Sequence, residues 1–122
     1  MAIHESGEMY LETIHVLSKQ QSAVRSIDVS EHMGYSKPSV SRAVGVLKKD
    51  GYILVDKEGF ITLTDSGLEV AQKIYARHQL LTLFLTGLGV SEETAAEDAC
   101  RMEHAISDES FTALQKYLEN KK

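Results

Sequence analysis

The sequence predicts a mainly α-helical protein, in which two short helices are followed by a two-stranded β-hairpin and then by an all-helical second half. Three observations support this fold class. Apolar residues recur at helical spacing through most of the 122 residues. A Gly-containing turn at residues 34–36 separates two short helical segments. Two β-branched and aromatic runs, residues 52–55 and 60–63, follow at the separation expected of a hairpin.

The composition is that of a globular protein inside a cell. The chain is 43% hydrophobic and 25% charged and has one proline, which suits one domain or two small ones sharing a core. No apolar run approaches the roughly 20 residues that span a membrane, and the first residues lack the basic and apolar regions of a secretory signal. A single cysteine excludes an internal disulfide framework. We therefore expect a cytoplasmic protein with no membrane partner.

Charge is distributed unevenly along the chain. Residues 37–49 contain four basic side chains and no acidic one, whereas residues 91–103 contain five acidic side chains and only Arg101 as a base. The net charge of −5 therefore does not exclude binding to nucleic acid, because a local basic segment matters more than the sum. The charge distribution alone would also fit two segments that are merely exposed to solvent. The sequence motifs therefore have to show whether the basic segment binds nucleic acid.

The first half contains three expected helices. Residues 8–19 form an amphipathic helix with Ser6 as its cap, and Ser26 precedes a short helix at residues 27–33. Gly34 stands where that helix should end. Ser36 caps the next helix, which has Pro38 in its first turn and runs to residues 50–51. Its apolar residues are expected in the core: Val40, Ala43, Val44 and Leu47.

The hairpin and the later helices follow in order. Residues 56–59 form the hairpin tip, which contains Lys57. Thr64 and Asp65 cap a long helix that extends to about Leu85, before Gly87 and Gly89 interrupt it. Ser91 opens another helix with acidic residues in its first turn, and Ser107 or Asp108 caps a last helix ending near residue 120.

Residues that can bind a metal recur on two of these helices. Cys100, Glu103 and His104 lie at i, i+3 and i+4, which places a thiol, a carboxylate and an imidazole on one helix face. Met9 and Glu12, also three apart, offer a thioether and a second carboxylate. Taken singly, such residues more often stabilise a helix, face solvent or pack in a core.

The order and spacing of these motifs resemble the diphtheria-toxin-repressor family of metal-dependent transcriptional regulators, with its iron-responsive and manganese-responsive branches. The resemblance covers nearly the whole chain and lies in four segments: Glu8-Met9-Tyr10-Leu11, Tyr75-Ala76-Arg77-His78, Cys100-Arg101-Met102-Glu103-His104 and Ser107-Asp108-Glu109. It implies an N-terminal winged helix-turn-helix with a two-stranded wing at residues 1–64, followed by an all-helical metal-binding and dimerisation domain at residues 65–122. It also implies a homodimer that binds a palindromic DNA operator when loaded with metal and represses metal-uptake genes.

The resemblance implies which side chains contact DNA. By their match to the family's recognition helix, five residues face the DNA: Ser36, Pro38, Ser39, Ser41 and Arg42. The guanidinium of Arg42 can donate hydrogen bonds to O6 and N7 of a guanine, and Pro38 can contact a thymine methyl group. The alternative for Arg42 is an ion pair on the protein surface. Ser39 and Ser41 suit phosphates. Three lysines add salt-sensitive attraction to the backbone: Lys37, Lys48 and Lys57.

The resemblance also implies the metal ligands. Met9, Cys100, Glu103 and His104 match the primary site of the iron-responsive branch position by position. Glu12 and His78 match ligand positions of the manganese-responsive branch, and that branch has carboxylates where this chain has Met9 and Cys100. Because thiolate and thioether favour softer ions over Mn²⁺, Fe²⁺ is the expected metal and Mn²⁺ the alternative. Co²⁺, Ni²⁺ and Zn²⁺ are expected to substitute in vitro, with one or two ions per subunit.

Two other interpretations compete with a metal-dependent repressor. One is a winged-helix regulator that responds to a small organic ligand or to oxidation of Cys100, without metal. The other is a small metal hydrolase using Glu103 as its base. The sequence argues against an enzyme, because no separate general base or oxyanion-stabilising loop is evident.

Overall fold

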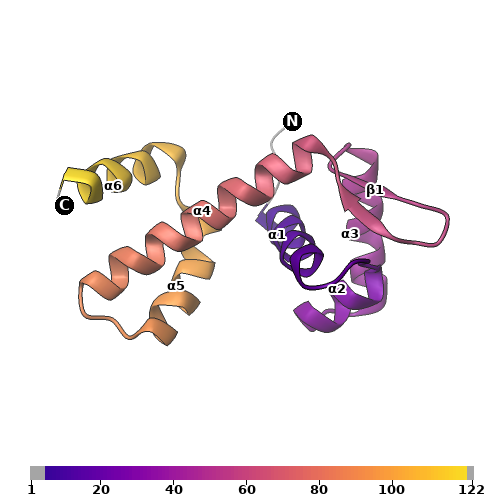
Figure 1. Ribbon diagram of the computed structural model, residues 1–122, viewed down its shortest axis with the longest axis horizontal. Coiled ribbons are helices and arrows are strands. Elements are labelled where there is room, and N and C mark those ends of the chain that lie inside the picture. Colours follow the sequence, from indigo (N-terminus) through magenta and orange to yellow (C-terminus); the bar gives the residue numbers. More distant parts are fainter. Residues whose placement is uncertain (1–4, 121–122) are drawn as a thin grey trace. The chain divides into compact units, whose positions relative to one another are not determined.

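The computed structural model describes residues 5–120, so the outer ends of the two predicted domains, at residues 1 and 122, lie outside the described part. Within it the chain is mainly α-helical, as predicted (Figure 1). The elements, in chain order, are α1 (Glu5–Gln20), α2 (Ser26–Met33), α3 (Lys37–Lys49), β1 (Ile53–Val55), β2 (Ile61–Leu63), α4 (Asp65–Gly87), α5 (Glu92–Ala105) and α6 (Asp108–Asn120).

The chain divides into two compact units, Met1–Gln72 and Lys73–Lys122. The division falls inside α4, so one helix belongs to both units. The functional boundary between residues 64 and 65 is a different kind of division and stays a prediction.

The N-terminal unit is built around a core to which all of its elements contribute. The residues expected to be buried on α3 are indeed inside: Val40, Val44 and Leu47 are buried, and half-buried Ala43 packs against them. The rest of the cluster comes from α1, α2, the connection after α1, both strands and the start of α4: Tyr10, Leu11, Ile14, Leu17, Val24, Val29, Ile53, Ile61 and Ala71. The apolar stripe of each helix therefore faces a common centre.

The helix-turn-helix forms as the sequence predicts. Gly34 ends α2 in the left-handed conformation, with φ of 73°, where a side chain would be strained. The Ser30 hydroxyl donates a hydrogen bond of 2.6 Å to the Tyr35 carbonyl and so holds the turn. The Ser36 hydroxyl caps α3 by accepting from the Ser39 amide at 3.3 Å, and Pro38 lies in the first turn. The turn thus orients α3 relative to α2.

Two predicted helix starts are wrong, the first by three residues and the second by one. The first helix already includes Glu5, so Ser6 lies inside α1 and is not its cap. The second helix begins at Ser26, with Arg25 as its cap residue. The Asp28 side chain accepts from the Arg25 amide at 2.8 Å and thereby extends the helix by one residue beyond the predicted start.

The β-hairpin forms the predicted wing and projects from α1–α3 (Figure 1). Its strands pair antiparallel, with Ile53 opposite Leu63 and Val55 opposite Ile61. Each strand is one residue shorter than predicted at its start. Asp56 shapes the tip, because its carboxylate accepts from the amides of Glu58 and Phe60 at 3.0 and 2.8 Å. This leaves Lys57 exposed at the tip.

The start of α4 is fastened to the turn that follows α3. The Thr64 hydroxyl donates to the Gly51 carbonyl at 2.7 Å and accepts from the Gly67 amide at 3.2 Å, which makes Thr64 the cap of α4. Gly67 comes so close to this turn that a Cβ there would lie 2.0 Å from the carbonyl oxygen of Tyr52. Only glycine permits this approach.

In the C-terminal unit, α5 runs back along the second half of α4 (Figure 1). Small side chains on α5, Ala95 and Ala99, are fully buried, as are Ile74 and Leu81 on α4. Serine caps open both later helices. The Ser91 hydroxyl accepts from the Thr94 amide at 3.3 Å, and the Ser107 hydroxyl accepts from the Ser110 amide at 3.0 Å, which makes Ser107 the cap of α6. Helix α4 extends two residues past the predicted end. Among the described residues no helix has the length and apolar character needed to cross a membrane.

Candidate functional site

Glu103 carries a carboxylate that is completely buried in the C-terminal unit, with 0% exposure. Its Oε2 accepts a hydrogen bond from Nδ1 of His78 on α4 at 2.8 Å. Its Oε1 lies 3.3 Å from Nε2 of His104 and accepts no hydrogen bond within the described part of the chain. A buried carboxylate is costly unless opposite charge or hydrogen bonds compensate it. The surroundings of Glu103 therefore suit a cation.

The three predicted ligands of α5 differ in burial. The side chains of Glu103 and His104 are 0% and 3% exposed, whereas Cys100, one turn earlier, is exposed. The exposed position of the thiol leaves it accessible from solvent. The imidazole of His78 is intermediate, with 30% exposure.

Within the C-terminal unit, three of the six predicted ligands lie close together: His78, Glu103 and His104. Met9 and Glu12 lie on α1 in the N-terminal unit, and both are half-buried beside the core residues Tyr10 and Leu11. The role of each of the six as a ligand stays a prediction.

The donor set fits a divalent transition metal. One carboxylate and two imidazoles are ligands that Fe²⁺, Mn²⁺, Co²⁺ and Zn²⁺ all accept. The buried Oε1 of Glu103, which accepts no hydrogen bond from the described residues, is an atom that a cation would compensate. The residues present therefore fit a metal ion.

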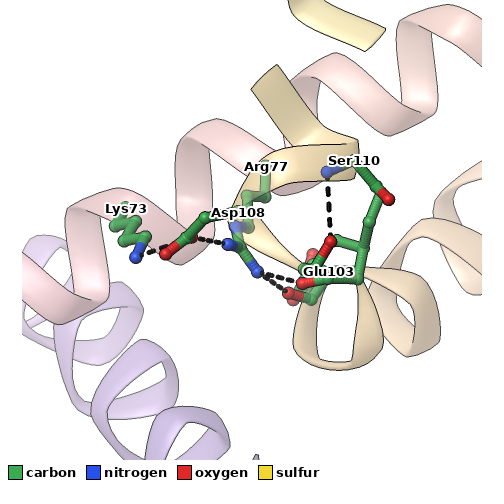
Figure 2. Close-up of polar contacts among 7 residues, drawn as sticks. Lys73, Arg77, Glu103, Asp108 and Ser110 are labelled. Atoms are coloured by element: carbon green, nitrogen blue, oxygen red, sulfur yellow. Dashed lines mark hydrogen bonds and ion pairs between the residues drawn. The ribbon is translucent and has the colours of Figure 1, made fainter. Parts of the chain in front are cut away.

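Arg77 is a site residue that the sequence interpretation missed. Its guanidinium is buried and donates from Nη1 to the main-chain carbonyl of Glu103 at 3.0 Å and to that of Ile106 at 2.9 Å (Figure 2). Its position on the apolar stripe of α4, three residues after Ile74 and four before Leu81, is a signal that could have revealed a buried charge.

The exposed face of α3 carries the predicted DNA-binding residues. Lys37, Pro38, Ser41, Arg42 and Lys48 are exposed, and Ser39 is half-buried. Three side chains of this face already interact with one another. The Ser36 hydroxyl donates to the Ser39 hydroxyl at 2.9 Å, and Arg42 donates to the same oxygen at 3.5 Å. Arg42 thus lies along the surface of its own helix, and its role in DNA binding stays a prediction.

Comparison with known families places both halves of the chain. Residues 2–59 match the N-terminal DNA binding domain of the iron dependent repressors. Residues 64–122 match the metal binding and dimerisation domain of the same repressors.

Individual relatives agree with these matches. An HTH-type transcriptional regulator of Methanocaldococcus jannaschii is 33% identical over 94% of this chain and 94% of its own length. The regulator MntR of Geobacillus kaustophilus is 35% identical over 84% of this chain and 72% of its own. The diphtheria toxin repressor of Corynebacterium diphtheriae is 30% identical over 95% of this chain and 52% of its own.

Solved structures show the same fold. The manganese regulator SloR matches with a TM-score of 0.81 and 31% identity over 98% of this chain and 55% of its own. A manganese-dependent transcriptional repressor solved with manganese matches with a TM-score of 0.84 and 30% identity, over 93% of this chain and 52% of its own. This chain thus spans about half the length of these two. The chain belongs to the diphtheria toxin repressor and MntR family of metal-dependent transcriptional repressors.

Proposed function

We propose that this chain is a cytoplasmic repressor that binds a palindromic operator as a homodimer when loaded with a divalent metal, and that the metal is Fe²⁺. The observation that supports a metal site is the buried Glu103 carboxylate, with the imidazoles of His78 and His104 at 2.8 and 3.3 Å. The family of transcriptional regulators to which the chain belongs supports a regulatory role and argues against an enzyme.

Six residues are proposed to hold the metal: Met9, Glu12, His78, Cys100, Glu103 and His104. The assignment of Met9 and Glu12 rests on residue type and on their match to the family. The two sulfur donors, Met9 and Cys100, favour Fe²⁺ over Mn²⁺, because Mn²⁺ prefers oxygen ligands.

Mn²⁺ is the second candidate. It is supported by the relatives, since SloR is named a manganese regulator and another matched repressor was solved with manganese. The cluster of Glu103 and two imidazoles suits Mn²⁺ as well as Fe²⁺, so the choice between the two ions depends on the sulfur atoms.

The bound cation would supply positive charge that compensates the buried carboxylate. The protein's own residues provide the rest of the proposed switch. In the proposed site, Glu12, Glu103 and a Cys100 thiolate would bring together up to three negative charges, which would repel one another without a counter-charge. The N-terminal unit carries α3, and half-sites of an operator are spaced by about 34 Å per helical turn. Because α1 and α3 share one core, a metal that fixed the position of α1 would also fix the position of α3. The two α3 helices of a dimer would then be held at the spacing that DNA requires.

DNA recognition is proposed to fall to α3 in the major groove. Arg42 would contact a base edge, and the serines and lysines of this face would contact phosphates. Lys57 on the wing would contact the backbone beside the groove. The absence of acidic residues from the first turn of α3 favours the approach of a polyanion.

Dimerisation is proposed to use exposed apolar residues of the C-terminal unit. Leu83 and Leu88 are 70% and 68% exposed, and Tyr117 on α6 is 49% exposed. A groove beside them is lined by Leu80, Leu83 and Leu118. Leu81, two residues before Leu83 on α4, is fully buried and so belongs to the core.

Anaerobic selection of DNA from a random duplex library, repeated with Fe²⁺, Mn²⁺, Co²⁺, Zn²⁺ or a chelator, tests the proposal. We expect a palindromic sequence to be enriched with metal and not with chelator, and Fe²⁺ to act at the lowest free concentration. Glu103→Gln should abolish the metal response. Glu97→Gln, an exposed position on the same helix, is the matched control and should retain it.

Other results would point elsewhere. Enrichment that is equal with metal and with chelator would support a metal-independent regulator. A response to Mn²⁺ at far lower concentration than to Fe²⁺ would select the second candidate. A metal response retained in both Cys100→Ala and His104→Ala would contradict the ligand assignment.

A further inference from the structure

Arg77 is a buried cation for which neither DNA binding nor metal ligation provides a role. It lies on the stripe of α4 that also carries Ile74 and Leu81, and its side chain is 6% exposed. Burying a guanidinium is costly unless its donors and its charge are compensated. The partners of Arg77 therefore indicate what the residue does.

Arg77 contacts three oxygens close to the connection between α5 and α6 (Figure 2). Nη1 donates to the carbonyls of Glu103 and Ile106 at 3.0 and 2.9 Å. Nη2 forms an ion pair with Oδ1 of Asp108, the first residue of α6. Nε has no acceptor among the described residues. Arg77 thus ties the end of one helix and the start of the next to α4.

The Asp108 carboxylate is held from two sides. Nζ of Lys73, one turn before Arg77, lies 2.9 Å from the same Oδ1. Hydrogen bonding by Lys73 and the charges of both bases keep the pKa of Asp108 below its usual value of 3.8. Asp108 therefore remains ionised and available to Arg77 at neutral pH.

Of the two carbonyls that Arg77 binds, that of Glu103 is a group that α5 itself leaves unsatisfied, and that of Ile106 belongs to the cap residue that follows the helix. The last four carbonyls of a helix have no partner within the helix, and α5 ends at Ala105. A positive charge at this end also complements the helix dipole. Arg77 therefore stabilises the last turn of α5, which is the turn that carries Glu103 and His104.

Two consecutive residues of α4 bind the main chain and the side chain of Glu103. Arg77 binds its main-chain carbonyl, and His78 binds its carboxylate at 2.8 Å. We propose that Arg77, anchored by Asp108, is a positioning residue for the metal site: it fixes the last turn of α5 so that Glu103 and His104 meet His78 in a geometry ready for the ion. This inference rests on the metal site of the proposed function.

The test measures metal affinity and coordination rather than stability. Arg77→Met keeps an unbranched side chain of similar reach but removes all three contacts. Lys73→Met is the matched control, because it removes an Asp108 partner without touching α5. Anaerobic Co²⁺ binding by chelator competition, with the visible absorption spectrum of the bound ion, is recorded where circular dichroism shows every variant folded.

The expected result is a loss of about 10- to 100-fold in Co²⁺ affinity for Arg77→Met, the range seen when partners of ligating residues are removed. Its absorption bands should shift, since Glu103 and His104 would no longer meet the ion in the same geometry. Lys73→Met should match the wild type in both measurements. Equal affinity and an unchanged spectrum in Arg77→Met would overturn the inference.

If Arg77→Met does not fold, the Arg77→Lys variant tests whether Arg77 positions the metal-binding turn of α5. A lysine keeps the charge but lacks the planar fork that reaches two carbonyls and a carboxylate together. Weaker Co²⁺ binding than the wild type, with a shifted spectrum, would support the inference, and wild-type behaviour would overturn it. Failure of the wild type itself to bind Co²⁺ would instead contradict the proposed function.

Discussion

Nδ1 of His78 and Oε2 of Glu103 form a 2.8 Å hydrogen bond between α4 and α5, across 25 positions of the sequence. Both atoms belong to side chains proposed as metal ligands. The hydrogen bond keeps the two side chains together before an ion arrives, which reduces the ordering that binding would otherwise require.

Replacing the two sulfur donors by carboxylates should change the preferred metal. In a Met9→Asp and Cys100→Glu double variant, hard oxygen ligands stand where a thioether and a thiolate stood, and such ligands suit Mn²⁺. We expect the free Mn²⁺ concentration needed for operator binding to fall and that of Fe²⁺ to rise. Anaerobic fluorescence anisotropy with each metal measures both. An unchanged order of metals would show that the sulfur atoms do not determine selectivity.

Arg42→Ala should weaken and broaden DNA recognition. Loss of a bidentate contact to guanine costs about 1–3 kcal/mol and relaxes the preference at that base pair. Lys48→Ala is the comparison, because a lost phosphate contact weakens binding to all sequences and lowers the salt slope by about 1. Binding to the selected operator and to its single-base variants, measured over a range of salt concentrations, separates the two. Retained base preference in Arg42→Ala would assign Arg42 a role other than reading bases.

Gly67→Ala should destabilise the N-terminal unit, because the added Cβ would lie 2.0 Å from the Tyr52 carbonyl oxygen. Gly45→Ala is the matched control in α3, where a Cβ has no neighbour within 4 Å. Alanine there should stabilise the helix by roughly 0.5–1 kcal/mol. Urea unfolding of both variants measures the difference, and opposite signs are expected. A stabilised Gly67→Ala would mean that α4 can move away from the turn freely.

The winged helix-turn-helix was largely predictable from the sequence, whereas the contacts of Arg77 with the last turn of α5 were not. Gly34, Ser36 and Pro38 predict the turn and the start of α3 from local chemistry, and the structure confirms them. The predicted cap at Ser6 is wrong because a short polar residue can also lie inside a helix. Arg77 was missed because two of its partners are main-chain carbonyls, which no residue type reveals.

Leu47→Ala should cost about 2–5 kcal/mol of stability, since it empties a buried position of α3. The adjacent Val46 is 58% exposed, and Val46→Ala should change stability by no more than about 0.5 kcal/mol. Chemical unfolding monitored by circular dichroism tests this pair. Similar losses in both variants would show that the exposed side of α3 is covered in solution.

Acid should destabilise the metal-free protein through His15. Burial, reinforced by the charge of Lys19, lowers the pKa of His15 below its usual 6.5. Between the lowered pKa and 6.5 the unfolded chain binds more protons than the folded one, so stability falls as the pH drops through that window.

The His15→Gln variant should lose less stability over that range, and His32→Gln, at an exposed position, should behave as the wild type. Thermal melting across this pH range with a chelator present makes the comparison. An acid loss that is the same in His15→Gln and in the wild type would assign the effect to other groups.

The hydrogen bonds from Arg77 to the carbonyls of Glu103 and Ile106 also influence the dielectric environment of the Glu103 carboxylate. Because a side chain of α4 satisfies the Glu103 carbonyl, the last turn of α5 can keep the Glu103 side chain fully buried. The effective dielectric constant in a protein interior is well below that of water, so each charge acts more strongly on its neighbours. A cation therefore interacts more strongly with the buried Glu103 carboxylate than it would with a carboxylate on the surface. A metal sensor can use this larger interaction energy to drive a conformational change.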